Sequence, residues 1–311
     1  MAETEISIDA GAVTLAASLA RPVDGPARGA ALFLHGSGPL DRDENIASQK
    51  LNVFNVLAAD LAQIGIASIR YDKRGCGRSS GVYHDAGQTE LLDDARAALH
   101  ALRREVPGVP IFLVGHSEGT LMGVRLSLDE TVDGLVLLTP FLQKLEPMLR
   151  GQAGEAEKAI AEMKGFGGWL NRMLLRIIGS PRTHQDRLIA RLKSGTETSF
   201  RYIGRRIEAK SLRELLALDP AEIYPQVRVP MLVLGGGKDV QCNPEDVHRI
   251  AAIVGPLATP VLIDDLTHIL RRDEGPAGFG SYARLIAQPL DAGIRQIVAD
   301  WIAERLEARP R

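Results

Sequence analysis

The stretch "FLVGHSEGT", residues 112–120, places one serine between two glycines directly after a run of apolar residues. Residues 111–114 are typical of a buried strand, and residues 120–128 are typical of a helix. The pattern G-x-S-x-G in a strand–turn–helix setting presents a serine hydroxyl at the carboxyl end of the strand. Ser117 is therefore either a nucleophile held on a sharp turn or an ordinary loop serine, and the rest of the sequence must decide between them.

The residues on either side of the serine favour the first interpretation. In such a turn a side chain at Gly115 or Gly119 would collide with the neighbouring strand and helix, and Ser117 is forced into a strained backbone conformation. The backbone N–H of Glu118 would lie at the N-terminus of the helix, where it can stabilise a developing oxyanion. Ser117 is thus a candidate nucleophile, and Glu118 is a candidate oxyanion donor.

Short apolar runs alternate with helical patterns along most of the 311 residues. Six runs without polar alternation are typical of strands that are covered on both faces. The runs are AALFLH (30–35), IASIRYD (66–72), PIFLVG (110–115), DGLVLLT (133–139), VPMLVLGG (229–236) and TPVLID (259–264). The helical patterns cover residues 51–64, 88–105, 118–128, 243–254 and 290–308. This alternation predicts an α/β fold with a mostly parallel central sheet flanked by helices, preceded by a hairpin in residues 6–20.

The alternation stops at residues 141–218, which contain no strand-like run. This segment has 15 Lys and Arg against 8 Asp and Glu residues, a net charge of +7, whereas the whole chain carries −2. Apolar residues at helical spacing would form one helix face. They are Phe166, Trp169, Leu170, Met173, Leu174 and Ile177. The sequence therefore predicts a helical insertion of residues 141–218 in one core domain of residues 1–140 and 219–311.

A serine hydroxyl becomes a strong nucleophile only when a base removes its proton, so an acid and then a histidine should follow Ser117 in the chain. Three histidines do follow it. His184 lies in the predicted insertion, His248 lies in a helical pattern, and His268 lies on a short loop after a strand. His268 is the predicted base, because a side chain on that loop can reach the carboxyl edge of the sheet.

The carboxylate that orients the base is predicted to be Asp239. It directly follows a predicted strand and precedes His268 by 29 residues. Asp264 and Asp265 compete for this role, but both lie too close to His268 along one strand end to reach under its ring comfortably. A turn or a helix cap is the alternative role for Asp239.

A second oxyanion donor is expected from the loop after an earlier strand. The segment LFLHGSGP ends a strand near His35, and Gly36 and Gly38 would let the loop bend toward the serine. The N–H of Ser37 is the predicted donor, with Gly38 as the alternative. His35 is predicted to be structural and to hold this loop by hydrogen bonds.

Composition narrows the class of protein. A net charge of −2 gives no support for nucleic-acid binding, and no window approaches the roughly 20 consecutive apolar residues of a membrane-spanning helix. Cys76 and Cys242 form no C-x-x-C pair, and residues 1–10 do not resemble a signal peptide, so we expect a cytoplasmic protein. The segment DRDEN (41–45) opens like a calcium loop, but Ile46 stands where that loop requires glycine.

These motifs together resemble the α/β-hydrolase superfamily, and in particular its bacterial serine carboxylesterases. The matching segments occur in the family's order over nearly the whole chain. They are HGSGPLDRDEN (35–45), YDKRGCGRSSG (71–81), GHSEG (115–119), GGKDVQCNP (236–244) and LTHIL (266–270). In such proteins the D-x-R-G-x-G-x-S segment is usually a structural loop near the site, and a helical cap is inserted where residues 141–218 lie.

The resemblance implies cleavage of a small-molecule carboxylic ester through an ester of Ser117, without a cofactor or a metal. His268 would be the base and Asp239 its orienting acid. The N–H groups of Glu118 and Ser37 would bind the oxyanion. An acyl-CoA or other thioesterase is the leading rival, because a positively charged cap could attract anionic substrates. A non-catalytic ligand-binding α/β-hydrolase is the rival from another class.

The apolar face of the predicted cap allows two interpretations. If it turned toward the serine, four of its residues would line an acyl pocket. These residues are Phe166, Trp169, Leu170 and Met173. The same face could instead pack against the other helices of the cap.

Overall fold

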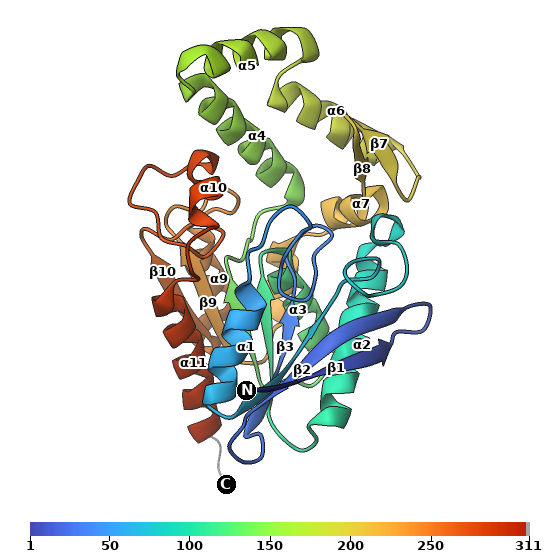
Figure 1. Ribbon diagram of the computed structural model, residues 1–311, viewed down its shortest axis with the longest axis vertical. Coiled ribbons are helices and arrows are strands. Elements are labelled where there is room, and N and C mark those ends of the chain that lie inside the picture. Colours follow the sequence, from blue (N-terminus) through green and yellow to red (C-terminus); the bar gives the residue numbers. More distant parts are fainter. Residues whose placement is uncertain (309–311) are drawn as a thin grey trace.

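The computed structural model describes residues 1–308, without the side chains at 171, 172, 174 and 176–178. Leu174 and Ile177 of the predicted cap face, and residues 309–311 of the predicted core, therefore lie outside the described residues. An eight-stranded sheet forms the centre of the molecule (Figure 1).

The eight strands follow the order β1-β2-β4-β3-β5-β6-β9-β10 across the sheet. β1 is antiparallel to β2 and β2 to β4, whereas all pairings from β4 to β10 are parallel. The strands are β1 (Ala2–Asp9), β2 (Thr14–Arg21), β3 (Gly29–Leu34), β4 (Ile66–Tyr71), β5 (Ile111–His116), β6 (Gly134–Leu138), β9 (Met231–Gly236) and β10 (Ala258–Ile263). The six predicted strands, the N-terminal hairpin and the mostly parallel sheet are confirmed.

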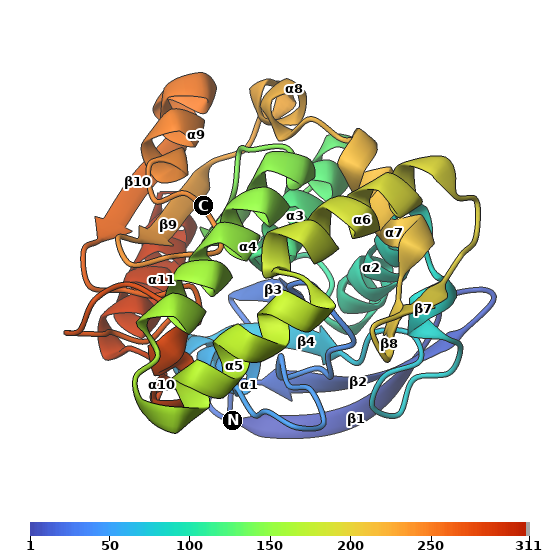
Figure 2. The ribbon, with the colours of Figure 1, turned by 90° about the horizontal axis from the view of Figure 1, so that it is seen from above.

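Helices cover both faces of this sheet (Figures 1 and 2). They are α1 (Val53–Gln63), α2 (Gln88–Glu105), α3 (Glu118–Asp129), α9 (Asp246–Val254) and α11 (Ala292–Glu307). Two short helices, α8 (Pro220–Ile223) and α10 (Tyr282–Leu285), lie in the connecting segments. On one face α1 and α11 pack against strand residues such as Phe33 and Val114, and on the other α2, α3 and α9 pack against residues such as Leu32 and Leu113. Successive strand residues point to opposite faces, so a strand covered twice is apolar throughout.

The parallel strands all end at the same edge of the sheet. The loops after β3, β5, β9 and β10 therefore meet there, and they carry the predicted residues Ser37, Ser117, Asp239 and His268. In open α/β sheets a ligand site forms at this carboxyl edge.

The segment between β6 and β9 forms a further layer above this edge. Its elements are α4 (Leu145–Glu162), α5 (Gly165–Ile178), α6 (Pro181–Ser194), β7 (Phe200–Tyr202), β8 (Arg205–Ile207) and α7 (Ala209–Ala217). In Figure 1, α4, α5 and α6 form an arch, and α5 lies farthest from the sheet. We call residues 141–218 the insertion.

The prediction that the insertion contains no strand is wrong at β7 and β8. Ile203 and Gly204 connect these strands with φ values of 46° and 76°, as in a tight two-residue hairpin turn. Phe200 is anchored by the Arg191 guanidinium, which lies 3.8 Å from the centroid of its ring. Strands of three residues are too short to produce a periodic pattern in the sequence.

Two other features bear on the class of protein. Cys76 and Cys242 are both buried free thiols. Among residues 1–308, none of the helices combines the length and the apolar character that crossing a membrane requires.

Candidate active site

Ser117 stands on the turn between β5 and α3 with backbone angles φ 52° and ψ −120°. Such a positive φ is strained for serine, and the surrounding packing has to hold it. A Cβ built on Gly115 would lie 2.3 Å from the carbonyl oxygen of Gly119, and one built on Gly119 would lie 2.0 Å from that of Leu34. Only glycine fits these two positions, because the turn is pressed between β3 and the start of α3.

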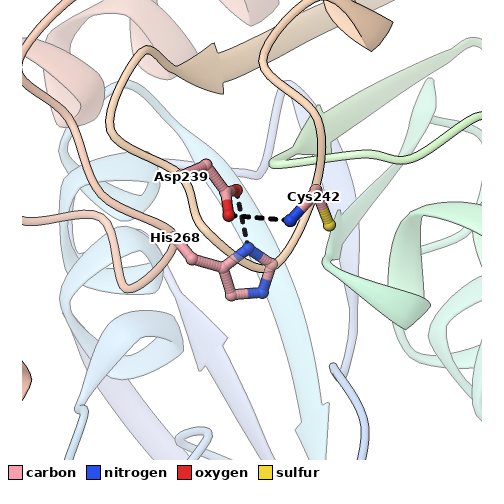
Figure 3. A group of neighbouring side chains, drawn as sticks. All are labelled: Asp239, Cys242 and His268. Carbon is pink, nitrogen blue, oxygen red and sulfur yellow. Dashed lines mark hydrogen bonds and ion pairs between the residues drawn. The ribbon is translucent and has the colours of Figure 1, made fainter. Parts of the chain in front are cut away.

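The structure brings Ser117, His268 and Asp239 together at the carboxyl edge of the sheet. Ser117 Oγ lies 3.0 Å from His268 Nε2, and His268 Nδ1 lies 2.7 Å from Asp239 Oδ2. Asp239 Oδ1 accepts hydrogen bonds from the backbone N–H groups of Gln241 and Cys242, both at 2.8 Å. Figure 3 shows the bond from Cys242 and the contact of Asp239 with His268. A hydroxyl, an imidazole and a fixed, buried carboxylate thus form one continuous chain.

The competing histidines and aspartates have other surroundings. His248 is exposed on α9, and His184 lies on α6 in the insertion. Asp264 is exposed, and Asp265 Oδ1 pairs with Arg272 at 2.7 Å. The carboxylate and the imidazole beside the serine are therefore the two that the motif spacing predicts.

The two predicted oxyanion donors line the same cavity as Ser117. Glu118 is the first residue of α3, so its N–H belongs to the helix N-terminus, where no carbonyl one turn earlier accepts it. A Cβ built on Gly36 would lie 3.3 Å from Ser117 Cβ, so the loop that carries Ser37 runs directly past Ser117. The N–H of Gly38, the alternative donor, already donates to a tyrosine hydroxyl at 3.1 Å.

Sequence analysis missed a buried pair beneath the serine. His116 Nδ1 lies 2.5 Å from Glu44 Oε2, and His116 Nε2 donates to the backbone carbonyl of His268 at 3.0 Å. Glu44 Oε1 accepts the N–H of Gly36 at 2.5 Å, so the pair connects the loop of residues 36–38 to the loop that carries His268. Both partners lie inside motifs that were recognised, but they are 72 residues apart, and only the fold brings them together.

Burial opposes ionisation of both members of this pair, and their mutual attraction outweighs it. Burial alone would lower the pKa of His116, but the charge of Glu44 and the hydrogen bond to it raise that pKa above its usual value. Burial alone would raise the pKa of Glu44, but the charge of His116 and the hydrogen bond to it lower that pKa. The imidazolium–carboxylate form is therefore the favoured one.

We expect replacement of Glu44 by glutamine to destabilise the protein by about 1–3 kcal/mol near pH 5.5, because the charged hydrogen bond is lost while neutral ones can persist. The raised pKa of His116 stabilises the fold fully below about pH 6.5, and this contribution is lost as pH rises through the folded pKa. The lowered pKa of Glu44 contributes above about pH 4.3, and this is lost as pH falls. Urea unfolding at pH 5.5 and 9 measures the difference.

The destabilisation caused by Glu44→Gln should therefore be smaller at pH 9 than at pH 5.5. Glu155→Gln is the matched control, because Glu155 lies on the surface of α4 and pairs there with Lys158. The control should change the free energy of unfolding by less than about 0.5 kcal/mol. A destabilisation by Glu44→Gln that grows with pH would contradict the ionised pair.

A cavity of about 370 Å³ opens at Ser117. Its wall is mainly apolar, and it is built from the start of α4, from α7 and from the loops after β3, β6 and β10. Examples of the lining residues are Leu40, Phe141, Leu145, Met148, Leu212 and Leu215. An apolar cavity beside a polar reacting group suits a ligand with an apolar body and one polar bond.

The four predicted pocket residues on α5 do not line this cavity. Phe166 is 75% exposed, Trp169 53%, Leu170 39% and Met173 42%. The physical reason is that α5 crosses the far end of the arch, away from the sheet (Figure 1). The insertion reaches the cavity instead through α4 and α7.

A further structural prediction that needs correction concerns His35. The residue is buried, but both of its ring nitrogens lack a hydrogen-bond partner among the described residues. It packs instead against the rings of Phe54 and Tyr71, at centroid distances of 5.5 and 4.9 Å. Burial, assisted by the charge of Lys73, lowers the pKa of His35 to about 4, so the ring is neutral and acts by packing.

Asp239, Cys242 and His268 form the one group that could hold a metal ion among the described residues, with candidate ligand atoms within 4.8 Å of one another (Figure 3). Both carboxylate oxygens of Asp239 and Nδ1 of His268 are already engaged in hydrogen bonds. Burial and the charges of Asp239 and Asp246 raise the pKa of the Cys242 thiol well above its usual range. A metal would have to displace this thiol proton and the bond between acid and histidine, so the group fits a metal poorly.

The comparisons with known proteins agree with this geometry. The chain matches the family described as serine aminopeptidase, S33, over residues 47–275. It is 25% identical over 277 residues to esterase EstD of Thermotoga maritima, covering 88% of this chain and 62% of EstD. It is 28% identical over 94 residues to the monoglyceride lipase homolog of monkeypox virus, covering 29% of this chain and 33% of that protein. The structure of Est1E from Butyrivibrio proteoclasticus with bound ferulic acid is similar with a TM-score of 0.64 and 16% identity, covering 97% of this chain and 99% of Est1E.

The sheet, the turn at the serine and the likeness to Est1E define an α/β-hydrolase fold. Because the family match spans well over half of its residues, the chain belongs to the serine aminopeptidase S33 family. The chain spans about three fifths of the length of EstD and one third of that of the viral protein.

Proposed function

We propose that the protein is a serine hydrolase that cleaves carboxylic esters through an acyl-enzyme intermediate. The observation that carries this proposal is the hydrogen-bonded chain from Ser117 Oγ through His268 to Asp239 beside an apolar cavity. The names of EstD and Est1E, an esterase and a protein with a bound carboxylic acid, agree with it. A cytoplasmic location stays a prediction.

Acylation begins when His268 Nε2 removes the proton from Ser117 Oγ as this oxygen attacks the acyl carbon. The carbonyl π electrons move to oxygen, and the N–H groups of Ser37 and Glu118 donate to the resulting oxyanion. Asp239 holds the imidazole in the required tautomer and stabilises the imidazolium. The oxyanion then re-forms the carbonyl, the bond to the leaving alcohol breaks, and the alcohol oxygen takes the proton from Nε2.

Deacylation repeats these steps with water. His268 Nε2 removes a proton from water as the water oxygen attacks the acyl carbon of the Ser117 ester. The second tetrahedral oxyanion collapses and expels Ser117 Oγ, which recovers its proton from the imidazolium. The carboxylic acid leaves, and the hydroxyl, imidazole and carboxylate regain their starting states without a net change in charge on the protein.

The cavity offers the amino terminus of a peptide one carboxylate without a charged partner, that of Glu118, so an ester is the simpler substrate. A substrate ammonium group calls for an unpaired carboxylate in the cavity, as buried charges require partners. The carboxylates among the lining residues are Glu44 and Glu118. Glu44 is paired with His116, and Glu118 Oε1 accepts from Gln88 Nε2 at 2.7 Å.

Part of the positive charge of the insertion is engaged in ion pairs away from the cavity, which weakens the argument for an anionic acyl-CoA substrate. Several of its basic residues pair with acids on the outer surface of the insertion. These pairs are Arg150 with Glu146 and Asp186, Lys158 with Glu155, Arg182 with Glu157, and Lys193 with Glu146. Exposed pairs of this kind are typical of solvated helix faces. We therefore propose a carboxylic ester as the substrate, with thioesterase activity as the alternative function.

We further propose that residues 141–218 act as a cap on a core domain of residues 1–140 and 219–311. Helices α4 and α7 supply apolar side chains such as Leu145 and Leu212 to the cavity wall. The proposed catalytic residues all lie on the core domain. Changes in the insertion can therefore alter acyl selectivity without altering the chemistry.

We expect kcat/KM for p-nitrophenyl esters to rise with acyl length and to peak at about four to eight carbons, because the cavity is apolar and of limited volume. Each buried methylene is worth about 0.8 kcal/mol, which corresponds to roughly a fourfold gain. Leu212→Trp should shift the peak to shorter chains, because Leu212 lines the cavity. Leu170→Trp is the matched control and should leave the peak unchanged, because Leu170 is exposed on α5.

The test of the proposed function combines this ester series with acyl-CoA thioesters, amino-acid p-nitroanilides and a fluorophosphonate probe. Ester turnover with labelling of Ser117 supports a serine esterase. Preference for acyl-CoA or for the anilides would replace it with a thioesterase or an aminopeptidase. A folded protein that neither turns over a substrate nor reacts with the probe would indicate the non-catalytic, ligand-binding alternative.

A further inference from the structure

Two of the three backbone N–H groups in the loop of residues 36–38 donate hydrogen bonds within the protein. The N–H of Gly36 donates to Glu44 Oε1 at 2.5 Å, and the N–H of Gly38 donates to Tyr83 Oη at 3.1 Å. The N–H between them, at position 37, has no acceptor in the part of the chain that the structure describes. It is the one donor of this loop that can serve an oxyanion.

Lys73 holds the carbonyl groups of the same loop. Its Nζ donates to the carbonyl oxygen of Gly36 at 2.5 Å and to that of Gly38 at 3.1 Å. Lys73 is only 6% exposed, and no carboxylate of the described residues lies within ion-pair distance of it. The ring of Tyr83 also lies beside this ammonium group, with its centroid 5.4 Å from Nζ. A buried ammonium without a paired carboxylate is costly, so its place beside this loop calls for an explanation.

The chain around Lys73 fixes where its side chain is. Lys73 lies two residues after the end of β4, the neighbour of β3, and so lies beside the loop that leaves β3. The preceding Asp72 is tied to Arg42 Nη2 at 2.9 Å and to the N–H of Arg78 at 2.9 Å. The segment YDKRGCGRS is thus anchored at its aspartate, and its lysine is delivered to the loop of residues 36–38.

The geometry of a peptide unit links this lysine to the site. A trans peptide points its C=O and its N–H in opposite directions, and the described residues contain no cis peptide. Since Lys73 holds the carbonyl of Gly36 on one side, the N–H of Ser37 in the same peptide unit points to the other side. Ser37 lines the cavity together with Ser117, so that side is the one where the substrate would bind.

We propose that Lys73 is a positioning residue of the oxyanion hole: its ammonium aligns the peptide unit between Gly36 and Ser37 so that the Ser37 N–H faces the reacting carbonyl. A positive charge at the carbonyl end also polarises this amide, which makes its N–H a stronger donor. The proposal rests on the proposed function, because an oxyanion forms only if the protein performs acyl transfer.

The expected effect follows from the size of an oxyanion-hole contribution. Loss of one donor typically lowers kcat by about 10²–10³-fold. Lys73→Met removes the ammonium and leaves the Ser37 N–H in the chain, so we expect a smaller loss of about 10–100-fold in kcat. KM should change by less than about threefold, because the apolar wall that binds the acyl chain is untouched.

The experiment compares the wild type with Lys73→Met, Lys73→Arg and Lys158→Met. Lys158 is the matched control, since it is an exposed lysine on α4 that pairs with Glu155. Turnover of p-nitrophenyl butyrate gives kcat and KM. Inhibition by phenylboronic acid reports oxyanion binding without turnover, because boron accepts an electron pair of Ser117 Oγ, the Oγ proton moves to His268, and a boron oxygen can occupy the oxyanion position.

The proposal expects the boronate affinity and kcat of Lys73→Met to fall by similar factors with KM nearly constant. Lys73→Arg should recover part of the loss, and Lys158→Met should stay within about twofold of the wild type. A kcat of Lys73→Met within threefold of wild type would overturn the proposal, and so would a loss of kcat with unchanged boronate affinity.

If the proposed function is wrong, the experiment gives a different result from the one expected if only the role of Lys73 is wrong. In that case the wild type itself would neither hydrolyse esters nor bind the boronate, and the role of Lys73 would fall with it. If Lys73→Met unfolds below the assay temperature, Lys73→Gln replaces it, because glutamine keeps a neutral donor of similar size. The changes in kcat are then compared with those in KM and in boronate affinity, as for Lys73→Met, and they test the role of Lys73 in the same way.

Discussion

Ser117→Ala is expected to reduce the kcat for p-nitrophenyl esters by about five to six orders of magnitude. Without Oγ no acyl-enzyme can form, and His268 has no bonded hydroxyl to activate, because its Nε2 points at that atom. The residual rate would come from water activated in a site that still binds the oxyanion. Initial rates at saturating substrate, together with loss of fluorophosphonate labelling, measure the effect.

The control for this variant is Ser127→Ala. Ser127 lies on the same helix as Glu118, but its Oγ donates only to the carbonyl of Val124 at 2.7 Å, so its loss should change kcat by less than about twofold. Retention of labelling and turnover by Ser117→Ala would show that another residue is the nucleophile, and the proposed mechanism would then be wrong.

Asp239→Asn is expected to lower kcat by about 10⁴-fold while the protein stays folded. Oδ1 of Asp239 accepts two backbone N–H groups, so the amide oxygen of asparagine must occupy that position. Its NH₂ group then faces His268 Nδ1 and donates to it. The imidazole is thereby forced to carry its proton on Nε2, where it cannot accept the proton of Ser117.

The pH dependence of kcat for Asp239→Asn, with Asp265→Asn beside it, tests this explanation. Asp265 also lies near His268 in the chain, but it pairs with Arg272 at the surface, so its replacement should cost less than about threefold in kcat. A hydroxide-dependent rise in the activity of Asp239→Asn above neutral pH is expected, as a strong external base bypasses the imidazole. A large loss in Asp265→Asn with little loss in Asp239→Asn would move the acid to Asp265.

Five strands, β3, β4, β5, β6 and β9, could be predicted because the fold buries them under helices on both faces. A strand that buries both of its faces must be apolar at every position, and such short runs are visible in a single sequence. α2 covers residues 88–105, the range of its helical pattern, because its apolar residues keep one period of 3.6 along the whole helix. The hairpin of β7 and β8 had no comparable signal, since each strand is three residues long.

The side chains of the candidate site also divide into those whose meeting the sequence could predict and those whose meeting it could not. The turn at Ser117, the loop of Asp239 and the loop of His268 each follow a strand, and parallel strands bring such loops to one edge. Their meeting could therefore be inferred from order and spacing. The partners of Glu44, His116 and Lys73 could not, because the first lies on the loop after β3, the second at the end of β5 and the third on the loop after β4. Their pairing depends on how these separate segments fold against one another.

The apolar face of α5 shows the limit of periodicity most clearly. The spacing of Phe166, Trp169 and Leu170 correctly indicates that the helix has one apolar side, but it carries no information on what that side meets. In the structure this side is exposed at the far end of the arch, and α4 and α7 line the cavity instead.

The sequence by itself therefore determined the class of fold and the order of the three candidate catalytic residues, since both follow from local patterns and from the direction of parallel strands. Only the tertiary structure decided which helices of the insertion form the cavity wall, and which buried charged side chains contact the loop of residues 36–38. These depend on contacts between segments far apart in the chain, and a contact of that kind leaves no periodic trace in either segment.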